Sequence, residues 1–271
     1  MNFRTLLTNL RTSGKICRGW SHRINYLRWI YGRSRASATP RSITFHYPPP
    51  VDTITVSVRC NLGSDAFIFS EVFDHRYYDF ELPQPPATIL DLGANIGFTS
   101  LYLARKYPCA ALACVEPVDR NVALLKRNLE SNHIPATVFP AAIGITDGLL
   151  EMNLDEHDYG HKVAGIEFGK TIAGRLIQVE SLSIPTLMRR LNWPRIGLLK
   201  MDIEGYEGVL LRRNCGWLAQ VDALCIECHE NYGEADLVAL AKDYGFSTPV
   251  PLPGIWLLTR PPAAGTPPHS L

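Results

Sequence analysis

The sequence predicts an α/β fold, namely a doubly wound, mostly parallel sheet with an N-terminal accessory layer. One observation is a glycine-rich turn, AspLeuGlyAlaAsnIleGly at 91–97, which lies between an apolar strand pattern and a helical pattern. The other is the alternation of strand-length and helical segments that continues to residue 259. Such alternation favours parallel strands joined by right-handed crossovers. We therefore expect functional residues at the carboxyl ends of these strands.

The first 45 residues differ in charge from the rest of the chain. They carry nine Lys or Arg and no acid, which leaves 18 basic and 26 acidic residues in the remainder. Their apolar residues alternate with Arg and form no run of about 18, so a basic amphipathic segment is expected rather than a transmembrane helix. Three interpretations stay open: an arm that folds back or is mobile, attachment to an anionic membrane surface, and an organellar transit peptide. Nucleic-acid binding is not expected, because the body is acidic.

Seven cysteines without a signal-peptide pattern indicate a reducing compartment. A cytoplasmic protein is therefore predicted, with membrane association if the arm binds lipid. Cys225 and Cys228 are three residues apart in a strand pattern, so their side chains point to opposite faces. No second pair has ligand spacing, and no metal site is expected.

Residues 46–86 are expected to form the accessory layer. Residues 51–59 alternate as a strand, and 65–73 continue as a strand or edge hairpin. The backbone of ProGlnProPro at 83–86 is incompatible with a helix and ends the layer. The predicted organisation is a basic arm at 1–45, accessory strands at 46–86, a cofactor-binding domain at 87–261 and a disordered tail at 262–271.

The core sheet is predicted to begin at Thr88. A helix follows from Phe98, with Thr99 and Ser100 suited to capping, and Asp119 is the expected N-cap of the next helix. Further strands are predicted at 111–116, 136–144, 196–202, 222–229 and 255–259, further helices at about 185–191 and 234–244, and a polar loop at 155–175.

The turn at 91–97 favours S-adenosylmethionine as the cofactor. Its spacing is GxNxG, whereas a dinucleotide fingerprint needs GxGxxG so that a pyrophosphate can approach the backbone. Asp91 would repel a pyrophosphate but could accept hydrogen bonds, directly or through water, from the ammonium of a methionine moiety. Glu116 lies 19 residues after Gly97 and ends the next strand, where a carboxylate can accept ribose hydroxyls. An NAD-dependent oxidoreductase is the alternative enzyme.

A second polar group is expected at the same edge of the sheet, after the fourth core strand. The sequence LysMetAspIleGluGlyTyrGlu at 200–207 places Asp202 and Glu204 beside the crevice. These acids indicate an anionic patch that positions a sulfonium and a substrate, with a hard-cation site as the alternative. Glu207 is expected only to start a helix, whose dipole favours an acid there.

These motifs resemble the FkbM family of S-adenosylmethionine-dependent methyltransferases. The resemblance covers about residues 69–229. It rests on the motifs at 91–97 and 200–207, and on ValGluPro at 115–117, AlaAlaIleGly at 141–144 and GluCysHisGlu at 227–230. It implies a class I (Rossmann-like) methyltransferase fold and O-methylation of a hydroxyl on a sugar, a glycan or a natural product. The arm and the tail lie outside the resemblance.

The predicted site has a cofactor end and an acceptor end. Alignment of acceptor oxygen, methyl and sulfur can supply about 7–11 kcal/mol, and a base that removes the hydroxyl proton adds to this. His229 is the predicted base, oriented by Asp202 or Glu227, although a strand-end histidine satisfied by backbone stays open. Asp202, Glu204 and His229 are the predicted catalytic residues. The predicted cofactor-binding residues are Asp91, Gly93, Asn95, Gly97, Phe98, Glu116, Asn121, Ala142 and Asp202.

Other features have more than one interpretation. His157 and His161 lie in a segment expected to be an acceptor-binding loop or an ordinary solvated loop. Tyr77 and Tyr78 would pack on a sugar ring or inside the accessory layer. A membrane-surface binding protein that keeps the fold without activity is the alternative from a different functional class.

Overall fold

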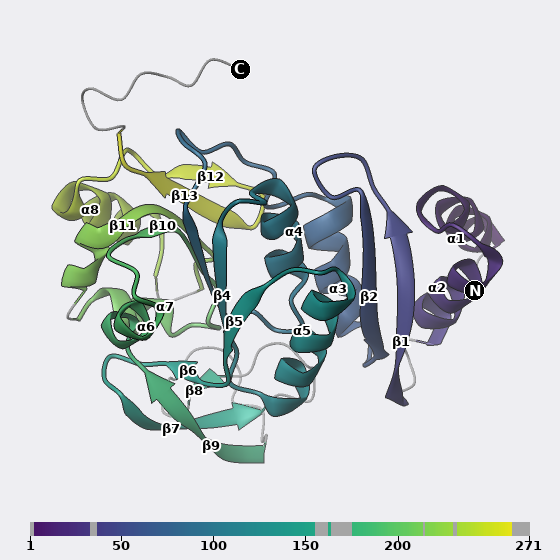
Figure 1. The fold of residues 1–271 in the computed structure, drawn as a ribbon, viewed down its shortest axis with the longest axis horizontal. Coiled ribbons are helices and arrows are strands. Elements are labelled where there is room, and N and C mark those ends of the chain that lie inside the picture. Colours follow the sequence, from purple (N-terminus) through teal and green to yellow (C-terminus); the bar gives the residue numbers. More distant parts are fainter. Residues whose placement is uncertain are drawn as a thin grey trace.

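The computed structural model describes residues 3–32, 37–154, 162–163, 175–213, 215–229 and 232–261. Within these ranges a seven-stranded sheet forms the centre of the molecule, in the order β12-β13-β11-β10-β3-β4-β5 (Figure 1). The parallel strands are β3 (Thr88–Leu92), β4 (Ala111–Val115), β5 (Ala136–Phe139), β10 (Ile196–Met201) and β11 (Val221–Ile226). Strand β13 (Ile255–Thr259) pairs antiparallel with β11, and β12 (Val250–Leu252) pairs antiparallel with β13. The predicted mostly parallel sheet is confirmed.

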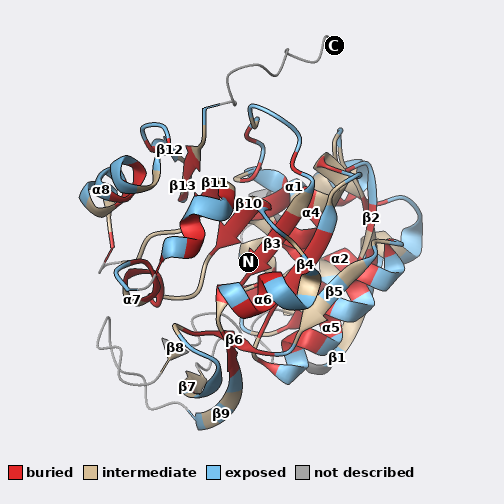
Figure 2. Ribbon diagram, turned by 60° about the vertical axis from the view of Figure 1, so that its left-hand side comes forward, coloured by how far each residue is buried: buried red, intermediate tan, exposed pale blue. Residues whose placement is uncertain are grey.

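Helices cover both faces of this sheet. Alternate residues of β3 face opposite sides, so that Ile89 packs in one apolar cluster and Leu90 in the other. Helices α4 (Phe98–Lys106) and α5 (Asp119–Ser131) pack in the first cluster. The second cluster includes α6 (Ile184–Leu191), α7 (Glu207–Leu211) and α8 (Glu234–Tyr244). The central strands β3, β4, β10 and β11 are accordingly mostly buried (Figure 2).

The N-terminal segment folds back onto the body through α2 and β1. Strand β1 (Ser37–His46) pairs antiparallel with β2 (Thr53–Cys60), α2 (Trp20–Gly32) lies against β1, and α1 (Phe3–Ile16) contacts α2. Trp29 of α2 is 1% exposed, and its indole nitrogen donates to the Arg59 carbonyl at 2.8 Å. The predicted boundary at 45/46 falls inside β1. No helix of the described residues has the length and apolar character needed to cross a bilayer.

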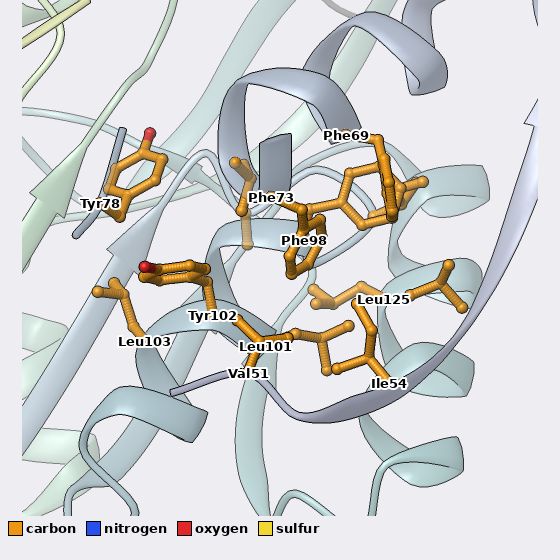
Figure 3. Close-up of a cluster of buried hydrophobic side chains, with 14 of the residues drawn as sticks. Val51, Ile54, Phe69, Phe73, Tyr78, Phe98, Leu101, Tyr102, Leu103 and Leu125 are labelled. Atoms are coloured by element: carbon orange, nitrogen blue, oxygen red, sulfur yellow. The ribbon is translucent and has the colours of Figure 1, made fainter. Parts of the chain in front are cut away.

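Residues 65–73 are helical, and the predicted strand or hairpin there is wrong. Helix α3 (Ser64–Phe69) runs directly into a π-helical turn, η1 (Ser70–Asp74). Phe69 and Phe73 are four residues apart on one face, and both contact the Phe98 ring, with centroids 5.4 and 5.9 Å away (Figure 3). This tertiary packing overrides the alternating pattern of the segment.

Both predicted helix caps are wrong. Gly97, with φ +92°, occupies the N-cap of α4, and Ser100 lies inside the helix, where its hydroxyl donates to Asp91. The N-cap of α5 is Val118, and Asp119 is the first helical residue. The acid still lies at the positive end of the helix dipole.

The predicted strand 136–144 is broken after Phe139. Pro140 has no amide hydrogen for a sheet ladder, which explains the interruption. The chain continues as β6 (Ala142–Ile143) in a separate sheet ordered β6-β9-β7-β8, hereafter the side sheet. Its other strands are β7 (Gly148–Leu154), β8 (Lys162–Val163) and β9 (Arg175–Leu182). The predicted strands 196–202 and 222–229 also end early, at Met201 and Ile226, so Asp202, Glu227 and His229 lie in the following loops.

Candidate functional site

A cavity of about 350 Å³ opens at the carboxyl ends of the parallel strands. Its floor is formed by the turns after β3, β4, β10 and β11, and α3 with η1 and the side sheet contribute to its walls. Of the predicted site residues, those that line the cavity are Gly93, Asn95, Phe98, Glu116, Asn121, Ala142, Asp202, Glu204 and His229. A crevice at this edge is what the parallel topology predicts.

The turns after β3 and β10 touch each other at Gly93. Gly93 has φ +73°, and a Cβ placed there would lie 1.8 Å from the carbonyl oxygen of Asp202. The Asp202 amide in turn donates to the Leu92 carbonyl at 3.2 Å. Only glycine fits this conformation and this approach. The two turns therefore have one fixed relative position.

Asp91 is buried beneath the cavity rather than facing it. It has no exposed surface, it accepts from the Ser100 hydroxyl at 2.5 Å, and its Oδ1 lies 3.2 Å from Lys200 Nζ. Burial alone would lower the pKa of Lys200, but Asp91 and Asp202 raise it well above its usual value. The predicted contact between Asp91 and a cofactor ammonium stays a prediction. Lys200 is the neighbour of Asp91 in the parallel register of β3 and β10.

Gly97 also lies outside the cavity lining. A Cβ at this position would lie 2.6 Å from Leu125 Cδ1 of α5, so glycine is needed here for packing between the turn and α5. The predicted role of Gly97 in cofactor binding stays a prediction, and the turn that it closes faces the cavity.

Glu116 has its carboxylate held by three protein donors. Oε1 accepts from the Val118 amide at 3.0 Å and from Asn121 Nδ2 at 3.1 Å, and Oε2 accepts from the Asn95 amide at 2.9 Å. Burial raises the pKa of Glu116, and these three hydrogen bonds act in the opposite direction. A carboxylate has about four acceptor positions, so the remaining one, on Oε2, is left for a ligand. This acceptor fits a ribose hydroxyl.

The acceptor end of the cavity contains a cluster of acids around His229. Glu207 is fully buried, and its two oxygens accept from the amides of Ile203 and Gly205 at 2.8 and 2.9 Å. These bonds hold Glu204 and Gly205 in the left-handed region, with φ +56° and +94°. The expectation that Glu207 only starts a helix is wrong, because its carboxylate shapes the turn that carries Asp202 and Glu204.

His229 contacts two carboxylates, Glu207 and Glu204. Its Nδ1 lies 3.3 Å from Glu207 Oε1, and its Nε2 lies 3.6 Å from Glu204 Oε2. Burial lowers the pKa of His229, but Glu207, Asp202 and Glu204 together raise it to about 9. The imidazole is thus protonated at neutral pH. The contacting carboxylates also differ from the predicted orienting residues, Asp202 and Glu227.

The sequence did not predict that Glu71 and Lys200 lie at the cavity, and it gave Glu227 only a role in orienting His229. Burial and the neighbouring Asp202 raise the pKa of Glu71 to about 7 and that of Glu227 to about 8. Glu71 was missed because its segment was assigned to a strand. Lys200 was overlooked although a lysine in an otherwise apolar buried strand signals a buried charge partner. Tyr77 and Tyr78 line the cavity, and Tyr78 is almost fully buried.

Among the described residues, Asp202, Glu207 and His229 have the ligand types for a divalent cation. Each offers one ligand atom, and these atoms lie within 4.8 Å of one another. A proton on His229 would compete with a metal. The absence of a metal stays a prediction. His157, His161 and the tail at 262–271 lie outside the described residues.

The fold and the cavity define a class I methyltransferase. The family described as "Methyltransferase FkbM domain" matches residues 91–247, more than half of the chain. The chain belongs to this FkbM methyltransferase family, whose methyl donor is S-adenosylmethionine. The resemblance stated from the motifs is confirmed, and the methyltransferase prediction holds against the NAD-dependent oxidoreductase.

Several relatives have methyltransferase names. Methyltransferase sdnD of Sordaria araneosa is 31% identical over 178 residues, 54% of this chain and 67% of the relative. Methyltransferase 1 of Beauveria bassiana is 27% identical over 209 residues, 69% of this chain and 83% of the relative. The 31-O-demethyl-FK506 methyltransferase FkbM of Streptomyces tacrolimicus is 23% identical over 219 residues, 69% and 84% of the two chains. The crystal structure of methyltransferase FkbM from Methylobacillus flagellatus KT is 12% identical, with a TM-score of 0.47, covering 93% of this chain and 58% of that one.

Proposed function

We propose that this methyltransferase acts on a hydroxyl group of a sugar, a glycan or a natural product. The observation that carries the proposal is a single cavity with Glu116 at one end and Asp202, Glu204 and His229 at the other. A cofactor held at the first end would present its methyl group toward the second. The name of the Streptomyces relative, a 31-O-demethyl-FK506 methyltransferase, supports an oxygen acceptor.

At the cofactor end, the residues act by binding and orientation. Glu116 offers its remaining acceptor position to a ribose hydroxyl, and Asn95 and Asn121 keep the carboxylate in place. Gly93 lets the turns after β3 and β10 meet beneath the cofactor, and Phe98 and Ala142 line the cavity with apolar surface. The bound cofactor supplies an electrophilic methyl group on a cationic sulfur. Asp202, which is partly exposed in the cavity, provides negative charge for that cation.

At the acceptor end, His229 removes the hydroxyl proton after losing its own. Neutral His229 can donate from Nδ1 to the buried Glu207, which leaves Nε2 as the acceptor of the substrate proton. Glu204 lies near Nε2, and Asp202 faces the same space. The proton of the acceptor hydroxyl would therefore pass to Nε2 of His229 as the oxygen takes the methyl group that a bound donor would supply.

Binding and acceptor screening test this proposal separately. Calorimetry with S-adenosylhomocysteine should give binding for the wild type and at least about tenfold weaker binding for Glu116→Ala. Transfer of labelled methyl from S-adenosylmethionine should then label hydroxyl compounds in a panel of sugars, glycans and polyketides with matched amines and carboxylic acids. Labelling confined to the amines or the acids would overturn the hydroxyl assignment and leave the cofactor assignment intact.

We also propose that the protein is cytoplasmic and that its N-terminal helices contact an anionic membrane surface. Apolar side chains project from both helices, with Trp20 78% exposed, Ile24 44%, Leu10 45% and Leu7 39%. They lie in a segment with nine basic residues and no acid. An amphipathic basic segment of this kind binds anionic lipid through apolar insertion and charge.

The membrane test should use the full chain. A truncation near Arg41 would remove the buried Trp29 and part of β1, so loss of binding would be uninformative. Full-length protein should sediment with phosphatidylserine vesicles and not with phosphatidylcholine vesicles. The double variant Trp20→Ser with Ile24→Ser should lose this binding and keep its melting temperature. Equal sedimentation of variant and wild type would exclude these side chains as the contact.

A further inference from the structure

Arg59, at the end of β2, is a buried charge that reaches from the accessory layer toward the cavity. Its guanidinium pairs with Asp65 of α3, with Nη2 2.8 Å from Oδ1 and Nε within 3.3 Å of both carboxylate oxygens. The Arg59 residue is 8% exposed and Asp65 is 1% exposed. Desolvation offsets the attraction within a buried ion pair, so this pair is not expected to add much to the free energy of unfolding. It does fix the orientation of the guanidinium.

The guanidinium fixes the orientation of the Asn121 amide. Arg59 Nη1 donates to Asn121 Oδ1 at 2.8 Å, and Asn121 Nδ2 donates to Glu116 Oε1 at 3.1 Å. Arginine can only donate and a carboxylate can only accept, so the amide oxygen must face Arg59 and the NH₂ group must face Glu116. The chemistry of its two neighbours thus allows only one of the two amide orientations.

Glu116 is the residue to which this orientation matters. The Val118 and Asn121 donors fill the acceptor positions of Oε1, and the Asn95 amide occupies one position of Oε2. The carboxylate is therefore turned so that its remaining acceptor position is on Oε2. If Asn121 lost its partner, its amide could rotate and the carboxylate would no longer have a single preferred orientation.

We propose that Arg59 is a positioning residue for the cofactor, acting through Asn121 to orient Glu116 toward the ribose. The proposal rests on the proposed role of Glu116. It gives the accessory layer a part in cofactor recognition, although Arg59 lies outside the residues matched by the family and contributes no atom to the cavity lining. Arg59 spans the distance because its planar fork offers separate donors to Asp65 and Asn121.

The test variant is Arg59→Lys. Lysine keeps a positive charge for Asp65, which avoids an unpaired buried carboxylate, but a single ammonium cannot replace the fork at both partners. The control is Asn132→Ala. Asn132, which follows α5, also connects β2 to the core. Its Oδ1 accepts from the Thr55 amide at 2.9 Å, and its Nδ2 donates to the Thr55 carbonyl at 2.7 Å. It has no bond to Glu116 or Asn121 among the described contacts.

Calorimetry should compare S-adenosylhomocysteine with its 2′,3′-dideoxy analogue. The wild type should prefer the ribose form, and Arg59→Lys should lose about tenfold in affinity for that form and less than about twofold for the dideoxy form. Asn132→Ala should lower the melting temperature and leave both affinities within about twofold of wild type.

The outcomes separate the proposal from its premise. An equal loss for both ligands in Arg59→Lys, or unchanged affinity for both, would overturn the positioning role. A wild type with no preference for the ribose form would instead remove the premise that Glu116 binds the ribose. If Arg59→Lys fails to fold, Asn121→Asp, which replaces the donor to Glu116 with an acceptor, should produce the same selective loss for the ribose form.

Discussion

The two ends of the cavity are built in different ways. At the cofactor end, backbone turns and amides define the geometry: Gly93 rests on the Asp202 carbonyl, and Glu116 is held by two amides and one asparagine. At the acceptor end, Glu207, Asp202 and Glu204 raise the pKa of His229, and the pKa values of Glu71 and Glu227 are raised as well. The binding geometry of the first end is therefore determined by the backbone, whereas the protonation of the side chains at the second end changes with pH.

Replacing Gly93 should have the largest effect. Gly93→Ala should destabilise the protein by about 3 kcal/mol or more, because its Cβ would meet the Asp202 carbonyl at 1.8 Å in a left-handed conformation. Gly216→Ala is the matched control, since no atom lies within 4 Å of its added Cβ. Chemical denaturation measures both. Similar, small effects of the two substitutions would refute the rigid contact between the turns.

Asp91→Asn should cost about 3 kcal/mol of unfolding free energy, because Lys200 would lose its buried partner. The control is Asp222→Asn, which breaks the half-exposed pair with Arg195 and should cost less than about 1 kcal/mol. Urea unfolding compares them. If Asp91→Asn were instead as stable as wild type and only lost cofactor affinity, the carboxylate would be a ligand contact after all.

The rate of methyl transfer should depend on pH much more strongly than the affinity for the cofactor product does. His229 must be neutral to act as a base, and its folded pKa is raised to about 9, so the rate should increase from pH 7 to about 9, roughly tenfold per unit. Affinity for S-adenosylhomocysteine should change by less than about threefold between pH 6.5 and 8.

Variants assign this pH profile to a residue. His229→Gln should be slow and lack the rise, whereas Glu71→Gln and Glu227→Gln test the other groups that titrate in this window, with pKa values of about 7 and 8. A profile that is unchanged in His229→Gln would exclude the base role and leave positioning as the source of the rate.

Chelation should have the smallest effect. With no metal expected at Asp202, Glu207 and His229, EDTA should change the transfer rate by less than about twofold, and added Mg²⁺ or Mn²⁺ should not increase it. Abolition of activity by EDTA, followed by recovery with a divalent cation, would show instead that these three residues bind a metal.

Local patterns predicted the strand, the turn and the helix around residues 88–106, because each is determined by neighbours in the chain. Glu116 was also located by local spacing. The buried ion pair of Asp91 was not predicted, since its partner, Lys200, lies 109 residues away and meets it only through the register of β3 and β10.

The remaining errors also arise from contacts distant in sequence. Phe69 and Phe73 follow a helical spacing because they pack on Phe98, which an alternating apolar pattern does not reveal. The raised pKa of His229 results from a fully buried glutamate that local sequence assigns to a helix start. Arg59 and Asn121 are 62 residues apart, so no spacing rule connects them.

The aromatic contacts of the N-terminal half set a lower limit on how this enzyme can be shortened or recombined. Trp29 of α2 packs edge-on against Phe69, and Phe69 packs edge-on against Phe98 beside the glycine turn, with both pairs of centroids 5.4 Å apart. A protein trimmed to residues 91–247 would lose the first two rings and expose the third. The smallest unit to express, or to graft into a chimera, therefore begins at α2.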